Sequence, residues 1–308
     1  LPIAMIILSV TVVPFFYRAK VYTAYEYLER RFDVKTRTLT AVLFLISRGL
    51  SCSVIVAAPA VILSIVLGWN LTLTVLAIGV PTVIYTMIGG VQAVTWTDVK
   101  QMGIIVSGIV AAVVVLILDL PKEISVGSAL HLAGAVGRTQ ALDFTFDVHQ
   151  TYTFWSGLIG GLFLSLSYFG CDQSQVQRYL TAKSVDEGRQ SLYMSAFVKI
   201  PLQALILLTG VLMFVYFVFH PSPLLLNDAP VAQIEAAGHG PEYSALEDEY
   251  VRAYQRRREA AEAMAASDDA SSRPAFVAAD AAVNDVRELA MALVKDATGD
   301  ASWTDVNY

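Results

Sequence analysis

The sequence predicts an all-α polytopic membrane protein, and three observations support that prediction. The chain is 56% hydrophobic and only 16% charged, whereas soluble domains carry about 25% charged residues. Its mean hydropathy is +0.57. Apolar stretches of about 20 residues, the length that a helix needs to cross a hydrocarbon core of ~30 Å, recur along residues 1–220.

Charge divides the chain into two regions. Residues 1–220 hold 14 Lys and Arg against 11 Asp and Glu, whereas residues 221–308 hold 7 against 16. The net charge of −6 therefore describes neither region and indicates no nucleic-acid partner. We predict a transmembrane core at 1–220 and an acidic extramembrane loop at 221–308.

Six membrane-spanning helices are expected in the core. They cover 2–17, 39–67, 71–90, 101–118, 153–171 and 191–219. Each stretch is predicted to be a helix because backbone groups in lipid must pair within their own segment. The first stretch is short and the chain ends without a terminal signature, so we interpret both ends as cuts through a longer protein.

A glycine pair marks the expected end of the third span. Gly89 and Gly90 follow the apolar stretch, and a left-handed glycine commonly ends a helix. A short connection over 91–97 is expected next, with Asp98 as the N-cap of the following helix.

The orientation follows from Lys and Arg in the short connections. The connections at 18–38, 91–100 and 172–190 are the basic ones, with Arg18, Lys20, Arg30, Arg31, Lys35, Arg37, Lys100, Arg178, Lys183 and Arg189. These segments are predicted to be cytoplasmic in a plasma membrane, of the bacterial inner-membrane kind. The tail at 221–308 is then extracytoplasmic.

The tail is expected to contain two helices. Residues 242–266 and 275–297 are rich in Ala, Glu and Arg, and the polar segment 267–274 separates them as a turn. Because their apolar stripes are thin, we expect a hairpin that packs on the membrane domain. A partly disordered loop is the alternative.

Two basic residues lie deep inside predicted spans. Arg48 is about ten residues into its helix, or about 15 Å along the axis, so it should point inward and neutralise a carboxylate or carbonyl ends. Lys199 should face a cavity or the helix bundle, because an ammonium group in lipid is costly. The alternative for Lys199 is that its long side chain reaches the cytoplasmic interface.

Polar residues follow the fifth span directly. Asp172, Gln173, Gln177 and Arg178 are predicted to form a network at the inner mouth that is made and broken during conformational change. A spacing of six does not put Asp172 and Arg178 on one helix face, so direct pairing requires a bend between them. The alternative is a static cap in which Arg178 holds a lipid phosphate.

The sequence carries no motif for catalysis. It has no GxSxG, HExxH or Walker sequence, and its four histidines lie in loops or at the end of a span. We therefore expect no enzyme activity, no catalytic residue, no cofactor and no metal site in these residues. Cys52 and Cys171 fall in apolar stretches and are expected to be small buried residues.

Three segments at predicted cytoplasmic boundaries resemble one known family. They are PFFYR at 14–18 with TAYEYLERRF at 23–32, YT…GGVQAVTWTD…Q at 85–101, and YFGCDQSQVQRYLTAK at 168–183. The sequence is similar here to the sodium:solute symporter family, which includes the sodium/glucose cotransporters.

The resemblance implies a LeuT-type core of inverted repeats, seen here in part, and sodium-coupled transport by alternating access. By that comparison the spans match core helices two to seven, and the helices that carry the principal sodium ligands lie outside this chain. Lys199 matches a lysine of the substrate pathway, and Tyr168 with Phe169 matches an aromatic pair that closes the sugar site.

The implied partners are sodium as the coupling ion, a small-molecule solute and the lipid bilayer; the third segment favours a sugar or polyol-like solute. Two other functions remain open. One is a sensory input module of the same fold joined to a kinase, and the other is a proton-coupled or uncoupled carrier. The oligomeric state is left open.

Overall fold

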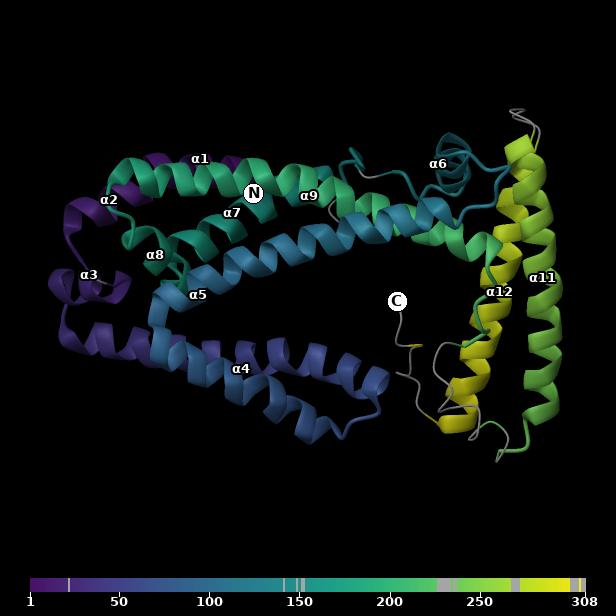
Figure 1. The fold of residues 1–308 in the computed structure, drawn as a ribbon, viewed down its shortest axis with the longest axis horizontal. Helices are drawn as coiled ribbons and strands as arrows, with labels where there is room; N and C mark the ends of the chain where they lie inside the picture. Colours follow the sequence, from purple (N-terminus) through teal and green to yellow (C-terminus); the bar gives the residue numbers. More distant parts are fainter. Residues whose placement is uncertain are drawn as a thin grey trace. The chain divides into compact units, whose positions relative to one another are not determined.

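The computed structural model describes residues 1–21, 23–140, 142–147, 149–150, 153–225, 234, 237–266, 272–299 and 305. In these ranges the chain forms helices and connecting segments, which confirms the all-α prediction (Figure 1). Two compact units are present: Leu1–Ser107 with Asp143–Gln203, and Gly108–Leu142 with Ala204–Tyr308. Helices α5 (Leu71–Leu118) and α9 (Val185–Phe219) contribute to both units.

In the part of the chain that the structure describes, five helical segments are long and apolar enough to cross a membrane. They are the paired helices α1 (Pro2–Val10) and α2 (Val12–Ala19), then α4 (Val34–Leu67), α5, α7 (Phe154–Cys171) and α9. The count differs from the expected six because the spans at 71–90 and 101–118 both lie in α5. That helix has 48 residues and a contour of about 72 Å, more than twice the hydrocarbon thickness.

A bend at Gly90 divides α5. Gly90 has φ 55° and ψ −150°, so its φ is positive, as expected, but it does not take the left-handed helical conformation. The helix resumes at once, so the predicted connection over 91–97 and the N-cap role of Asp98 are wrong. A Cβ at Gly89 would lie 2.2 Å from the Cβ of Ala93, so the bend also requires a glycine there.

The core of the first unit lies where α1 and α2 meet the short helix α8 (Gln173–Leu180) and the start of α9. Its fully buried side chains include Met5, Leu8, Val13 and Val176. Two glycines permit this close packing. A Cβ on Gly170 would lie only 3.2 Å from the side chain of Leu8, and a Cβ on Gly188 would lie only 3.1 Å from that of Val13. This core fixes the place where α7 ends and α8 begins.

Helix α4 leaves most of its apolar surface uncovered. Asp33 caps its N-terminus by accepting from the N–H of Thr36 at 2.7 Å, and Gly68 ends it in the left-handed conformation. Of its side chains in the span, Ala60 is buried, whereas leucines and isoleucines are exposed. Cys52 on α4 and Cys171 at the end of α7 are also exposed, so the expectation that both are buried is wrong. Such a surface suits lipid and neighbouring helices, not water.

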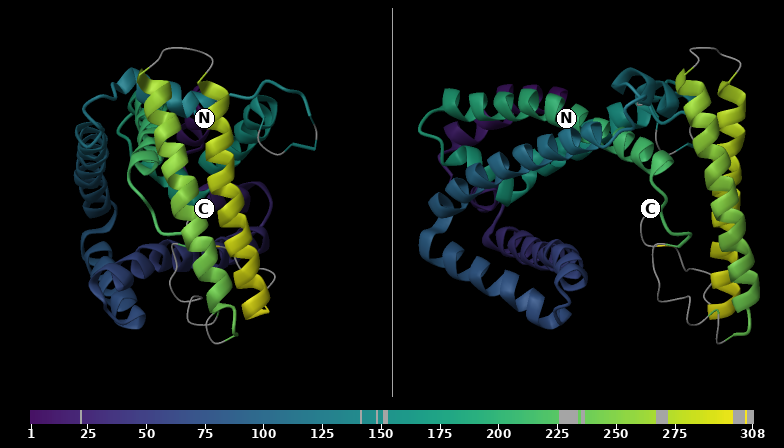
Figure 2. Two further views of the ribbon diagram at one scale, coloured as in Figure 1. Left: turned by 90° about the vertical axis from the view of Figure 1, so that its right-hand side faces the viewer. Right: turned by 45° about the vertical axis from the view of Figure 1, so that its right-hand side comes forward.

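The second unit contains α6 (Val126–Ala135), the ends of α5 and α9, and a hairpin of α11 (Gly240–Ala266) and α12 (Arg273–Thr298). The two hairpin helices lie side by side along their length (Figure 2). Their positions confirm the helices expected at 242–266 and 275–297. Of the predicted turn, 267–271 lies outside the described residues, whereas Arg273 and Pro274 begin α12.

The hairpin shares its core with the end of α9 and with α6. Phe276 and Ala261 are buried against Leu132, Val215 and Val218. The hairpin therefore packs on α6 and on the end of α9, and 240–266 and 273–298 form helices.

Candidate functional site

The candidate site lies in the first unit, at the break between α7 and α8. Asp172 ends α7 and caps α8: its Oδ1 accepts from the N–H of Ser174 at 2.9 Å and from the Ser174 hydroxyl at 2.6 Å. A carboxylate at a helix N-terminus satisfies free N–H groups and interacts favourably with the helix dipole. The chain therefore changes direction at a carboxyl side chain that caps the next helix.

Arg48 on α4 is the partner of this carboxylate. Its Nη2 pairs with Oδ2 of Asp172 and also donates to Oγ of Ser174 at 3.0 Å. Its guanidinium lies 5.6 Å from the ring centre of Phe44, and its buried Nε has no hydrogen-bond partner among the described residues. The carboxylate that Arg48 meets is thus that of Asp172.

Gln173 connects the break to the connection at 18–38. Its side-chain carbonyl accepts from the N–H of Ala24 at 2.9 Å, in a buried position. Ala24 begins α3 (Ala24–Arg31), whose N-cap Thr23 accepts from the N–H of Glu26. The bond therefore ties the start of α8 to the start of α3.

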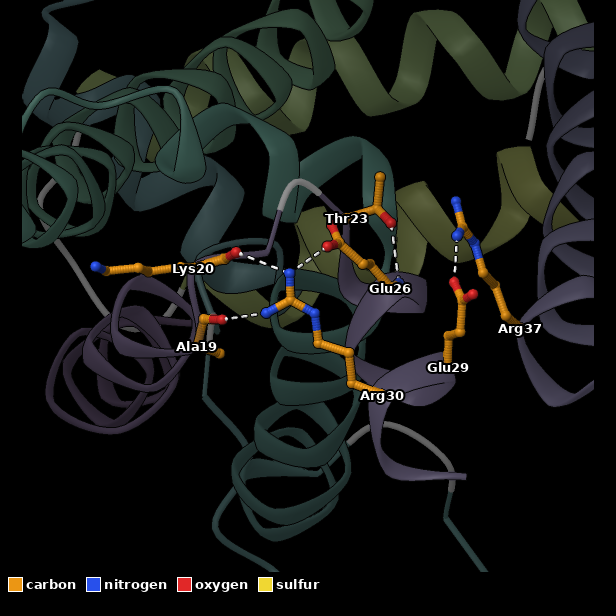
Figure 3. A network of polar contacts seen from close by, with 7 residues as sticks. All are labelled: Ala19, Lys20, Thr23, Glu26, Glu29, Arg30 and Arg37. Carbon is orange, nitrogen blue, oxygen red and sulfur yellow. Dashed lines mark hydrogen bonds and ion pairs between the residues drawn. The ribbon is translucent and has the colours of Figure 1, made fainter. Parts of the chain in front are cut away.

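Arg30 fixes α3 to the end of α2 (Figure 3). Its guanidinium donates to the carbonyl of Ala19 at 2.9 Å and to that of Lys20 at 3.4 Å, and it pairs with Glu26. Lys20 has φ 50°, so these carbonyls belong to a helix that ends in a left-handed turn, where a cation is favourable. The corner that supports Gln173 is thus held by its own polar contacts.

A second ion pair links the break to α5. Arg178 on α8 lies 3.1 Å from Asp98, and the exposed fractions of the two side chains are 60% and 43%. Asp172 and Arg178 do not pair directly; each has a partner on a different helix. The sequence predicted neither of these partners, although Asp98 stands out as the acid between two apolar stretches.

The aromatic residues of the break are joined through their polar atoms. The Tyr168 hydroxyl accepts from Nε2 of Gln175 at 2.9 Å, and the rings of Tyr168 and Phe169 meet edge to face at 5.0 Å. The Tyr179 hydroxyl donates to the carbonyl of Phe169 at 3.1 Å, and burial raises the pKa of Tyr179. Tyr168 is exposed and Phe169 is partly buried.

Two predicted site residues stay outside this network. Gln177 and Lys199 are exposed, and neither side chain makes a hydrogen bond or ion pair with a described residue. No contact joins Lys199 to Tyr168 or Phe169 within the described ranges. The structure thus brings Arg48, Asp172 and Gln173 to the same break as Tyr168 and Phe169, and leaves the side chains of Lys199 and Gln177 outside that network.

The charge of Asp172 also affects the neighbouring helix. Burial raises the pKa of Tyr25, and the negative charge of Asp172 raises it further. Tyr25 also packs against Phe44, with ring centres 5.6 Å apart. The phenol of Tyr25 is therefore held in its neutral form beside the ion pair.

A different polar cluster, missed by sequence reasoning, lies in the second unit. Arg257 on α11 pairs with Asp280 on α12 at 3.3 Å and donates to the carbonyl of Phe217 in the last turn of α9 at 2.7 Å. Both charged side chains are buried. In the ranges that the structure describes, no group of three or more His, Cys, Asp or Glu side chains is arranged to hold a metal ion.

Comparisons with known proteins agree on one family. A family model described as "Sodium:solute symporter family" matches residues 1–238. The chain is 38% identical over 182 residues to sodium-coupled monocarboxylate transporter 1 of Homo sapiens, covering 59% of the chain and 29% of that relative. It is 34% identical over 213 residues to the sodium-dependent multivitamin transporter of Oryctolagus cuniculus, covering 68% and 32%.

A third relative is the sodium/iodide cotransporter of Homo sapiens. It is 32% identical over 216 residues, covering 70% of the chain and 33% of the relative. The chain thus spans about a third of the length of these curated relatives.

Proposed function

The chain belongs to the sodium:solute symporter family, and from that premise we propose that the protein couples the movement of sodium to that of a small solute by alternating access. The helices that can cross a membrane place it among multi-pass membrane proteins. The family is one of transporters, not enzymes, and sodium is the proposed coupling ion, carried as cargo. The LeuT-type repeat is part of the same proposal.

The proposed topology has 18–38, 91–100 and 172–190 in the cytoplasm and the acidic tail 221–308 outside. Contacts of the first unit support it, because they join 172–190 to both other basic segments. Contacts of the second unit support it as well. The connection 119–152, which lies between two cytoplasmic connections and is therefore placed outside, contains α6, and α6 shares one core with the helices of the tail. In each unit, the segments in contact are thus assigned to the same side of the membrane.

The polar contacts of the α7–α8 break are proposed to form the inner-mouth network that changes during transport. The observation that carries this role is the Arg48–Asp172 pair, which joins α4 to the break while both side chains remain partly exposed. Such a pair opens at low cost, because water replaces the partner. Gln173 and Arg178 add contacts to α3 and α5, and Gln177 is the further member expected from sequence.

A small anion is the solute class that we favour. Two of the three relatives are named for monocarboxylate and iodide, which are anions. Lys199 is the cation expected inside α9, and an ammonium group in lipid is retained where it has a charged or polar partner. We propose that Lys199 interacts with the anion, with Tyr168 and Phe169 closing the site from the inner side.

A sugar is the second solute class, and it rests on the aromatic pair. A flat ring such as that of Tyr168 stacks on the apolar face of a pyranose while excluding water. The two classes make different demands on Lys199. Replacing its charge, as in Lys199→Met, should raise the KM for an anion about tenfold and change sugar uptake little.

Uptake by the full-length protein in proteoliposomes tests the proposal. Labelled lactate, iodide and glucose are offered with an inward sodium gradient, and with choline in place of sodium. We expect one solute to accumulate with sodium alone. Accumulation that is indifferent to choline, or that follows a proton gradient, would contradict sodium coupling. Labelled phosphate transferred to the protein without uptake would favour the sensory module.

A further inference from the structure

A shallow groove runs along one face of the α11–α12 hairpin, beyond the residues that the family model matches. Its volume is about 490 Å³. Both helices contribute to it, and its lining residues are Glu242, Ala245, Leu246, Glu249, Leu289, Ala292, Leu293 and Asp296. The groove belongs wholly to the second unit.

The floor of the groove is apolar and its rim is acidic. Leu246 and Leu293 lie at the edge of the hairpin core, and Leu289 is 56% exposed. The charged lining residues are all acids, and Glu249 and Asp296 make no ion pair with a described residue. An exposed leucine between unpaired carboxylates leaves both an apolar surface and a negative field unmatched.

We propose that this groove binds an amphipathic α-helix of a partner protein, with leucine-like side chains on one face and Lys or Arg beside them. A furrow between two antiparallel helices accepts the side-chain ridge of a third helix. The lining residues span 242–249 on α11 and 289–296 on α12, or about 12 Å along each helix, which is enough for about two turns of a partner helix. We infer basic residues on the partner because the charged side chains at the rim of the groove are all acidic.

Charge favours this occupant over two others. A second copy of the chain would bring the same acidic rim against the first, since residues 221–308 carry 16 acids against 7 basic residues. Anionic lipid headgroups would be repelled for the same reason. Both occupants are therefore outcomes that contradict the proposal.

The first test uses designed peptides and the full-length protein in nanodiscs of zwitterionic lipid. One helical peptide of about 18 residues carries leucines at i, i+3, i+4 and i+7 with flanking lysines. A second has glutamates in place of the lysines, and a third has the first composition in scrambled order. We expect saturable binding of the first peptide by fluorescence anisotropy, and no saturable binding of the other two or to empty nanodiscs.

Matched variants locate the binding. Leu289→Ser should weaken it about tenfold, whereas Val251→Ser, an equally exposed site on another face of α11, should not. Glu249→Lys should weaken it in a salt-dependent way, while Glu247→Lys, outside the groove, changes the net charge equally without that effect.

Three results would overturn the proposal. Equal loss in both members of a variant pair would show binding elsewhere. Self-association by analytical ultracentrifugation that Leu289→Ser abolishes would assign the groove to a second copy. Equal affinity for the acidic peptide would remove the role of the rim. None of these results depends on solute uptake, so they leave the transport proposal untouched.

Discussion

Two arginine–aspartate pairs of the same chemistry lie in very different surroundings. The Arg48–Asp172 pair at the α7–α8 break has side chains 29% and 21% exposed, whereas those of the Arg257–Asp280 pair in the hairpin are 7% and 9% exposed. Both arginines also bind a third group, the Ser174 hydroxyl in one case and the Phe217 carbonyl in the other.

The exposed fraction of the side chains decides which of the two ion pairs can open and close during transport. At a water-filled inner mouth, as proposed above, water solvates both charges when a partly exposed pair separates, so the free-energy change is small. When a buried pair separates, each charge loses its partner without regaining water. The first pair is therefore suited to change between states, and the second to hold the hairpin on α9 throughout.

The largest expected effect comes from removing one member of the buried pair. Arg257→Met leaves the buried Asp280 carboxylate without its cation and with only the 3.5 Å contact from Nδ2 of Asn284, which should destabilise the hairpin by about 3–5 kcal/mol. Hydrogen exchange of α11 and α12 in the full-length protein measures it. The double variant Arg257→Met/Asp280→Leu removes both charges and should recover most of the loss. If the amides of α11 and α12 exchange as slowly in Arg257→Met as in the parent, burial does not distinguish the two ion pairs.

Alkaline pH should reveal a second, smaller effect in the same region. Burial raises the pKa of Tyr254 to about 12, above the ordinary value of about 10. The fold favours the neutral phenol, so this stabilisation is complete below pH 10 and is lost as the pH rises to 12, amounting to about 2–3 kcal/mol.

Tyr254→Phe separates this effect from that of other tyrosines. The variant should remove the difference in hairpin protection between pH 10 and 12. It also removes a buried hydroxyl that has no partner among the described residues, so it should be at least as stable as the parent at neutral pH. A parent and variant that lose protection in parallel would show that the ionisation of Tyr254 is not responsible.

Breaking the Arg48–Asp172 pair should lower the stability less than breaking the buried pair does, but it should lower solute uptake strongly. Arg48→Gln leaves Asp172 partly solvated and still bonded to Ser174, so we expect a loss of about 1–2 kcal/mol measured by thermal unfolding. Uptake should fall at least tenfold. The charge exchange Arg48→Asp/Asp172→Arg tests the pairing itself: partial recovery of uptake is expected, and recovery absent alongside normal folding would contradict it.

The most exposed pair should matter least for stability. Arg178→Gln breaks the contact with Asp98. Because the side chains of both residues are about half exposed, the free energy of unfolding should fall by only about 0–1 kcal/mol. Lys183, another cation of the same connection, is exposed and its side chain makes no hydrogen bond or ion pair with a described residue, so Lys183→Gln is the matched control. A stability loss at position 178 as large as that at Arg257 would show that exposure does not rank these pairs.

Much of the fold could be predicted from sequence, because lipid and helix periodicity act locally. The spans in 39–67 and 153–171 and the hairpin helices follow from apolar length and composition. The bend at Gly90 was expected as a helix end, but a glycine pair does not show whether the helix stops or resumes.

The partners of the charged residues could not be predicted in the same way. Asp98 was expected to cap a helix, and it pairs with Arg178 across 80 positions of the chain. Arg257 gave no signal at all, because one arginine among three in a row shows nothing of which one is buried. Pairing of this kind depends on how helices pack, and a single sequence does not record it.

The Gly90 conformation has a consequence for the mechanics of α5. A φ of 55° with ψ of −150° is close to the mirror image of polyproline II, so the backbone reverses its hand for one residue. An L-alanine there would be strained, although the space around Gly90 is open, whereas a D-alanine would fit. The two helical segments of α5 therefore meet at one achiral residue, and a change in the φ and ψ of residue 90 alone would change the angle between them.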